Sequence, residues 1–255
     1  MATQASMSDT LLNGTVTDMA GGLGAERRSW WSAAREILRR SGAGEGWRAE
    51  FPDGSPPVEP GLTEYLSIPV TRPAEAAHRI LHIGDLSPES GAADFLNCVI
   101  LWAEQHPDRI VNLCWAGEGD LRGVLRAQPL PPTVHQRFTG ALTQSQIAGR
   151  LAHNGLLAAP SLSRNSPPYL LEAMASGVIV LGSARNLTVR SLVTHQDSGW
   201  LFDPHSPHSM LVGLNAMLEL EPRALDVMRE RARARASAFH GRTSGNWHER
   251  PAPDQ

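Results

Sequence analysis

The stretch PSLSRNSPPYLLEAMASGVIVLGSA, residues 160–184, carries the clearest structural pattern in the chain. It starts at the end of an apolar strand and continues as a loop with two adjacent prolines, an amphipathic segment, a turn of small residues and a second apolar strand. A strand, a helix and a second strand joined in this way form the βαβ unit of a parallel sheet. We predict the helix of this unit at residues 168–176 and the strand after it at residues 178–182.

The same alternation continues on both sides of this stretch. From residue 79 onward, short apolar runs alternate with longer amphipathic segments, which predicts a Rossmann-like, doubly wound parallel sheet of the α/β class. Strands are predicted at residues 79–84, 110–116, 135–138, 156–159, 178–182 and 199–202. Helices are predicted at residues 92–105, 121–127, 144–153, 168–176, 189–195, 207–220 and 221–239.

The first 78 residues have a different composition, rich in Gly, Pro and Ser, with one helical stretch at residues 26–40, ERRSWWSAAREILRR. We therefore predict a partly disordered appendage at residues 1–78, the sheet domain at 79–240 and a tail at 241–255. On the helix at 26–40, arginines frame an apolar face. Such a helix either docks on the sheet domain or lies on an anionic membrane surface as a peripheral contact.

Charge and cysteine content restrict the class of protein. The formal net charge of -3, from 23 basic and 26 acidic residues, provides no global field for nucleic acid, so nucleic acid is not an expected partner. Cys98 and Cys114 stand in apolar runs, which predicts buried free thiols in a reducing compartment. Neither a secretory leader nor an apolar run of roughly 20 residues is present, so we expect a cytoplasmic protein without a membrane span.

The titratable residues show no spacing that indicates catalysis or metal binding. None of the ten histidines is spaced as a ligand pair on a predicted helix, and no paired carboxylates or Ser-His-Asp arrangement can be recognised. We therefore expect no metal and no cofactor.

The run LEAMASG, residues 171–177, resembles the donor-site signature of the retaining GT-B glycosyltransferases of the group 1, or family 4, type. The signature of that family is a Glu, then seven residues, then Glu-Ala-Met-Ala-x-Gly-x-Pro-Val. The second Glu of this signature binds the ribose of a nucleotide sugar. The resemblance, which extends over residues 79–239, implies the C-terminal, nucleotide-sugar-binding half of a GT-B fold. It implies the donor-binding residues Glu172, Arg164, Tyr169, Leu170 and Gly84.

Elementary chemistry agrees with the role that the resemblance gives to Glu172. A carboxylate accepts two hydroxyl protons at once, and a helix N-terminus beside it offers backbone N–H groups to a diphosphate.

The departures from the family pattern concern charge. The Arg and Lys that neutralise the diphosphate in the family correspond here to Asp85 and Ser90. The first Glu of the signature corresponds to Arg164, and a later family Glu corresponds to Ser191. Pro168 also removes one backbone N–H where the family directs amides at phosphate. Losing two cations weakens the stabilisation of a phosphate leaving group.

Two functions therefore stay open. In the first, the protein takes part in hexosyl transfer from a nucleotide sugar with retention, as one subunit or in a truncated form, and a separate chain supplies the acceptor domain. In the second, it is a degenerate, noncatalytic homologue that acts as a binding or partner subunit.

A dinucleotide enzyme is a third, weaker interpretation. Gly117, Gly119 and Gly123 follow a predicted strand and resemble a Gly-x-Gly-x-x-x-Gly loop. A dinucleotide site also needs an acidic residue about 20 positions later, at the end of the next strand, and this sequence has none there. We therefore expect these glycines to form a tight turn between a strand and a helix.

Overall fold

The computed structural model describes residues 62–70, 72–163 and 169–245, all within the unit Glu45–Gln255. The predicted helix at 26–40 and the residues Arg164 and Pro168 lie outside the described residues.

Six parallel strands form one sheet in the order β3-β2-β1-β4-β5-β6, which confirms the predicted Rossmann-like architecture. All six predicted strands are present, with ends that differ by at most a residue from the predicted ones. The strands are β1 (Arg79–Ile83), β2 (Val111–Ala116), β3 (Val134–Phe138), β4 (Leu156–Ala159), β5 (Ile179–Ser183) and β6 (Gly199–Phe202).

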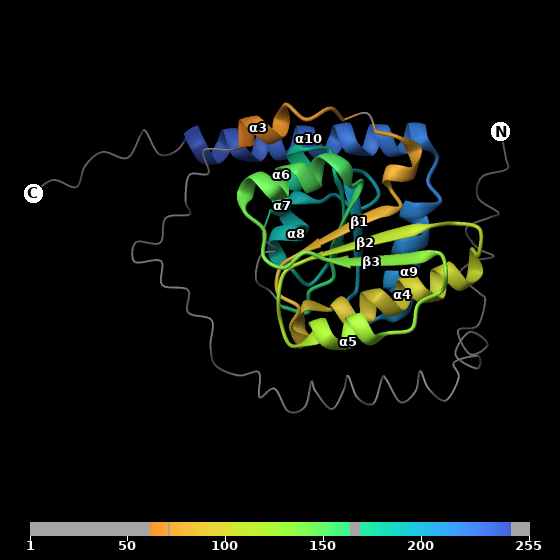
Figure 1. Cartoon of the computed structure of the whole chain (residues 1–255). Coiled ribbons are helices and arrows are strands. Elements are labelled where there is room, and N and C mark those ends of the chain that lie inside the picture. The colour runs from red at the N-terminus through yellow and green to blue at the C-terminus, as the bar shows by residue number, and fades with distance from the viewer. Residues whose placement is uncertain (1–61, 71, 164–168, 246–255) are drawn as a thin grey trace, which may run out of the picture. The chain divides into compact units, whose positions relative to one another are not determined.

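Helices cover both faces of this sheet (Figure 1). One face carries α4 (Ala92–Gln105), α5 (Leu121–Ala127) and α9 (Pro207–Leu218). The other face carries α3 (Leu62–Leu66), α6 (Gln144–His153), α7 (Leu170–Ala175), α8 (Leu187–Leu192) and α10 (Pro222–Gly245). Every residue of β4 and β5 is buried, as expected for inner strands with helices on both faces.

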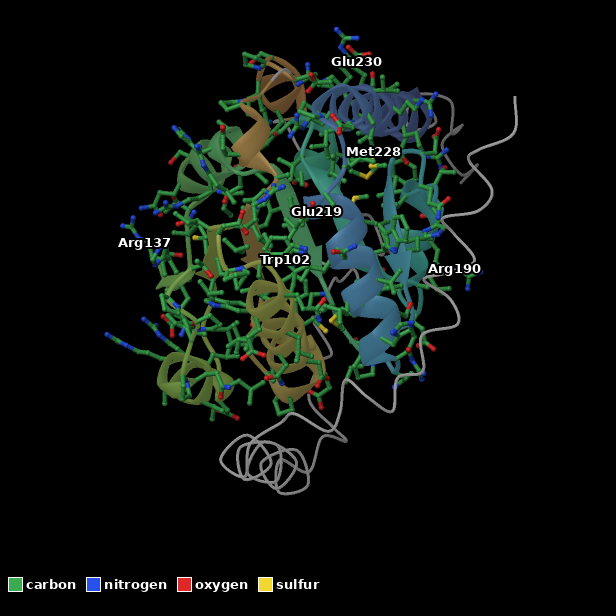
Figure 2. The ribbon with its side chains drawn as sticks, turned by 90° about the vertical axis from the view of Figure 1, so that its right-hand side faces the viewer. Trp102, Arg137, Arg190, Glu219, Met228 and Glu230 are labelled. Atoms are coloured by element: carbon green, nitrogen blue, oxygen red, sulfur yellow. The ribbon has the colours of Figure 1, made fainter. Side chains whose placement is uncertain are left out.

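Side-chain burial follows these layers (Figure 2). Trp102 of α4 is 1% exposed and Met228 of α10 is 6% exposed, whereas Arg137, Arg190 and Glu230 are exposed at the surface. The core is therefore built from the inward faces of the helices and both faces of the central strands.

Both cysteines are buried free thiols, as predicted. Burial is the largest cause that raises the pKa of Cys98, to about 12, and it also raises the pKa of Cys114. A thiol that stays protonated in an apolar core acts as a small hydrophobic side chain.

The structure differs from the predicted elements at several helices. The helix predicted at 189–195 is instead α8, which begins at Leu187 because the side chain of Asn186 caps it by accepting a hydrogen bond from the Val189 N–H (3.0 Å). The helix α10 extends to Gly245, beyond the predicted end at 239, and α9 ends two residues early, at Leu218. The sequence pattern missed α3, whose buried residues Leu62 and Tyr65 pack in the core beside α7 and α10.

Candidate functional site

The sheet changes its winding direction between β1 and β4. These strands pair side by side, with Leu81 opposite Leu157, yet α4 follows β1 on one face and α7 follows β4 on the other. Open α/β sheets bind ligands outside the carboxyl ends of the strands at such a point. The candidate site therefore consists of the loop after β1, residues 160–163 after β4 and the first turn of α7.

The loops after β1 and β4 are joined to each other directly. The carbonyl of Glu89 accepts hydrogen bonds from the Leu162 N–H (2.8 Å) and the Ser161 hydroxyl (3.3 Å). Gly91, with φ 69°, lies so close to Pro160 that a β-carbon would be 2.2 Å from the Pro160 carbonyl oxygen. This close approach of the two backbones holds the two sides of the site in one arrangement.

The loop after β1 also contacts the turn after β2. The Gly84 N–H donates to the Ala116 carbonyl (3.0 Å), and the Leu86 N–H donates to the Glu118 carbonyl (2.8 Å). Gly119 has φ 152° and packs against the Leu86 backbone. Gly117 and Gly119 therefore form the tight turn expected from the sequence, and their packing accounts for the glycines without a dinucleotide.

Three of the residues implied by the resemblance meet in one turn at the start of α7. Glu172 lies in the first turn and is only 8% exposed, although its side chain is a carboxylate. Leu170 is 2% exposed and anchors the helix in the core. Tyr169 precedes the helix in the left-handed region, with φ 60° and ψ 24°, where non-glycine residues are rare and are enriched at functional sites.

Asp85 and Ser90, the two positions where the resemblance led us to expect cations, have different surroundings. Asp85 is exposed on the loop after β1. Ser90 is 8% exposed, and its hydroxyl donates to the Ser87 carbonyl (2.6 Å) and accepts from the Ala92 N–H (3.2 Å). Ser90 therefore serves the turn that starts α4. Ser191 is exposed on α8, and its hydroxyl donates to the Thr188 carbonyl (2.9 Å).

The sequence analysis missed a buried histidine in β1, His82, which lies close to the loop after this strand. His82 is 5% exposed, and its Nδ1 lies 3.1 Å from the carbonyl oxygen of Ala158 in β4. A carbonyl only accepts, so Nδ1 carries the proton and donates. Burial is the largest cause that lowers the pKa of His82, which keeps the ring neutral. A polar residue inside the apolar run RILHI was the available signal.

The loops after β5 and β6 place a cation at the same edge of the sheet. Arg185 is exposed, and its Nη1 donates to Nε2 of His205 at 2.7 Å. Accepting this hydrogen bond requires Nε2 of His205 to be unprotonated. The position of Arg185, three residues after the end of the predicted strand 178–182, was a signal that the sequence analysis did not use.

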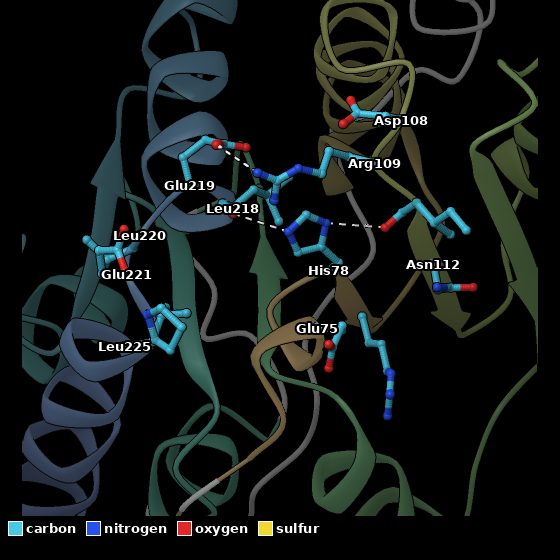
Figure 3. A pocket seen from close by; sticks show the side chains of 13 residues that line it. Glu75, His78, Asp108, Arg109, Asn112, Leu218, Glu219, Leu220, Glu221 and Leu225 are labelled. Atoms are coloured by element: carbon cyan, nitrogen blue, oxygen red, sulfur yellow. Dashed lines mark hydrogen bonds and ion pairs between the residues drawn. The ribbon is translucent and has the colours of Figure 1, made fainter.

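A cavity of about 660 Å³ lies at the opposite edge of the sheet (Figure 3). Its lining includes Arg79 and Asn112 near the amino ends of β1 and β2. His78 is held there by contacts with the carbonyls of Ile110 (3.2 Å) and Leu218 (3.2 Å). Because the predicted donor-site residues lie at the carboxyl ends of the strands, this cavity is separate from the candidate site.

The fold and a family model define the protein's class. The parallel six-stranded sheet and the helices that flank it match the Rossmann-like C-terminal domains of GT-B glycosyltransferases. The family model described as "Glycosyl transferases group 1" matches residues 68–235. The chain therefore belongs to the group 1 glycosyltransferase family.

Solved structures agree with this fold. The C-terminal domain of the group 1 protein LpcC from Francisella tularensis matches with a TM-score of 0.55 and 16% identity, over 63% of this chain and 84% of that domain. HepE (Alr3699) from Anabaena, solved in complex with UDP, matches with a TM-score of 0.56 and 20% identity, over 69% of this chain and 49% of HepE.

A third similar structure is the catalytic domain of cholesterol-alpha-glucosyltransferase from Helicobacter pylori. It matches with a TM-score of 0.52 and 18% identity, over 63% of this chain and 98% of that domain. No curated protein sequence matches the chain.

Two further findings apply to the described part of the chain. No helix there has the length and apolar character that a membrane span needs. No group of three His, Cys, Asp or Glu side chains there is arranged to hold a metal ion.

Proposed function

We propose that this domain binds the nucleotide of a nucleotide-sugar donor and takes part in hexosyl transfer with retention. The observation that carries the proposal is the burial of Glu172 in the first turn of α7, beside the point where the sheet changes winding direction. Hydrogen bonds that a charged carboxylate accepts are stronger than those between neutral groups, and two ribose hydroxyls supply two such bonds.

The other implied residues would support this contact. The left-handed backbone of Tyr169 and the buried side chain of Leu170 set the start of α7. Gly84, with φ 134°, leaves the loop after β1 without a side chain at the edge of the site. Because HepE is solved with UDP and with UDP-glucose, uridine nucleotides are the first to test.

Transfer also needs an acceptor site. The match spans about half of the HepE chain. We propose that a separate chain supplies the acceptor domain and completes the enzyme. If so, sugar transfer should be detected only when both chains are present.

One observation favours the noncatalytic alternative. Asp85 is an exposed carboxylate where the family carries a cation, and the Ser90 hydroxyl is engaged in its own turn. A noncatalytic binding subunit would bind nucleotide but release no nucleoside diphosphate from any nucleotide sugar. A donor domain together with its acceptor chain would release nucleoside diphosphate. Measuring diphosphate release with and without candidate acceptor chains separates the two functions.

Calorimetric titration with UDP, GDP, ADP and UDP-glucose tests the binding proposal. Glu172→Ala should lower the affinity for the tightest-binding nucleotide about 10- to 150-fold, since hydrogen bonds to a charged group contribute roughly 1.5 to 3 kcal/mol. Glu230→Ala, an exposed carboxylate on α10, is the matched control and should bind like the parent. Unchanged affinity in Glu172→Ala would remove Glu172 from the site, and no binding of any nucleotide would overturn the proposed function.

A further inference from the structure

Three arginines, Arg72 and the α10 residues Arg229 and Arg233, lie close enough together for their charges to interact. Arg72 donates through Nη1 to the carbonyls of Leu151 (2.7 Å), Ala152 (3.1 Å) and Asn154, and through Nη2 to that of Ser176 (2.7 Å). These carbonyls belong to the ends of α6 and α7, where a helix carries partial negative charge.

Arg233 of α10 uses the same kind of partner. Its Nε donates to the Ala175 carbonyl (2.8 Å), and its Nη2 donates to the Ile68 carbonyl. Backbone carbonyls therefore account for most donors of Arg72 and for the bonded donors of Arg233.

Arg229, one turn before Arg233 on α10, is bonded differently. It is 1% exposed, and its Nη1 donates to the Asp226 carboxylate at 2.7 Å. Its Nε and Nη2 are buried, and neither has a hydrogen-bond partner in the described part of the chain. The Nε of Arg72 is buried as well, and no described residue provides it with a hydrogen-bond partner.

The unpartnered atoms have a specific geometry. Nε and Nη2 form one edge of the planar guanidinium group, and their two parallel N–H groups match the two oxygens of a carboxylate or phosphate. Leaving two charged donors buried and unbonded is costly, because burial removes the water that would otherwise solvate them.

The local charge is strongly positive. Burial, followed by the nearby charges of Arg229 and Arg233, lowers the pKa of Arg72 to about 10. Asp226 provides one negative charge against three positive ones and is itself 38% exposed. A further negative charge in this position would relieve the repulsion between the guanidinium groups.

We propose that the Nε–Nη2 edge of Arg229, together with Nε of Arg72, binds a small oxyanion, a phosphate or a small carboxylate. Arg229 itself is buried, but Arg72 is only half-buried and Asp226 is partly exposed, so the cluster extends to the surface. The bound anion ties α10 to the segment before β1. The site lies at the amino edge of the sheet and is independent of the proposed donor site.

The test is the thermal unfolding of the full chain during titration with sodium phosphate or sodium acetate, with sodium chloride keeping the ionic strength constant. Saturation of the parent protein by one of the two anions should raise the midpoint by about 3 °C or more. A rise with phosphate identifies a tetrahedral anion, and a rise with acetate identifies a carboxylate.

Two variants assign the effect to Arg229. Arg229→Met removes the charge and should abolish the rise, and Arg229→Lys keeps the charge without the two-donor edge and should lose most of it. Arg223→Met, an exposed arginine on the same helix, should respond like the parent. The proposal is overturned if the parent responds to neither anion, or if Arg229→Lys retains the full rise. Arg229→Lys also keeps the test decisive should Arg229→Met fail to fold.

Discussion

The backbone of Gly117 packs directly against the carbonyl group of Gly84. A β-carbon on Gly117 would lie 1.8 Å from the carbonyl oxygen of Gly84 and 2.8 Å from its carbonyl carbon. Both partners are backbone, so neither can rotate away as a side chain would. This contact sets the distance between the turns that follow β1 and β2, and the loop after β1 is one side of the candidate site.

Gly117→Ala should therefore destabilise the domain by about 1 to 3 kcal/mol, the usual cost of overpacking. Gly123→Ala is the matched control, because Gly123 lies in α5 and a β-carbon added there would have no heavy atom within 4 Å. That substitution should be neutral or stabilise by up to about 1 kcal/mol, since alanine is the better helix former. Urea unfolding measures both, and equal stabilities of the two variants would contradict the packing argument.

Asp85→Arg should raise the affinity for a nucleoside diphosphate about tenfold or more, because it replaces a carboxylate by the family cation and adds a charge-assisted contact of roughly 1.5 to 3 kcal/mol. Affinity for the nucleoside without phosphate should not change. Asp108→Arg, an exposed carboxylate lining the cavity at the opposite edge, controls for net charge. If calorimetry finds the same gain in both variants, Asp85 does not lie near the phosphates.

Arg164→Glu restores the residue of the family pattern and reverses the charge in the loop after β4. We predict that Arg164 compensates for part of the missing charge at Asp85 and Ser90 by reaching the diphosphate. The variant should then bind nucleoside diphosphate more than tenfold more weakly than the parent, measured by calorimetry. Affinity equal to that of the parent, or higher, would exclude this compensation and favour a noncatalytic protein.

The buried His82 should make stability depend on pH. Its pKa is lowered in the folded state, chiefly by burial, so below about pH 6.5 the unfolded chain binds a proton that the folded one does not. The free energy of unfolding should therefore be independent of this group above that pH and fall as the pH drops below it.

Urea unfolding between pH 7.5 and pH 5 measures this slope. His82→Leu should reduce it by up to about 1.4 kcal/mol per pH unit, the limit for one proton. His135→Leu, an exposed histidine on β3, serves as the control and should keep the slope of the parent. Parallel curves for the parent and His82→Leu would show that another group governs the pH dependence.

The strand and helix pattern was largely predictable from the sequence because each element carries its own periodicity. The predicted limits of α4, α5 and α6 agree with the structure, and α6 begins at a capping box that the sequence contains at Thr143 and Gln146. The error at α8 arose because a single cap, Asn186, starts that helix before the apolar spacing becomes visible. The short helix α3 is stabilised by packing against α7 and α10, and it is too short for a local hydrophobic periodicity to predict it.

The sequence alone determined the α/β class, the order of the elements and the turn that contains Glu172, because hydrophobic periodicity and one local motif are properties of neighbouring residues. Tertiary structure alone decided that Glu172 is buried and that Gly117 touches Gly84. It also brought the guanidinium of Arg72 close enough to those of Arg229 and Arg233 for their charges to lower its pKa. These relationships join residues far apart in the chain, and their energies depend on desolvation and close packing, which exist only once the chain has folded.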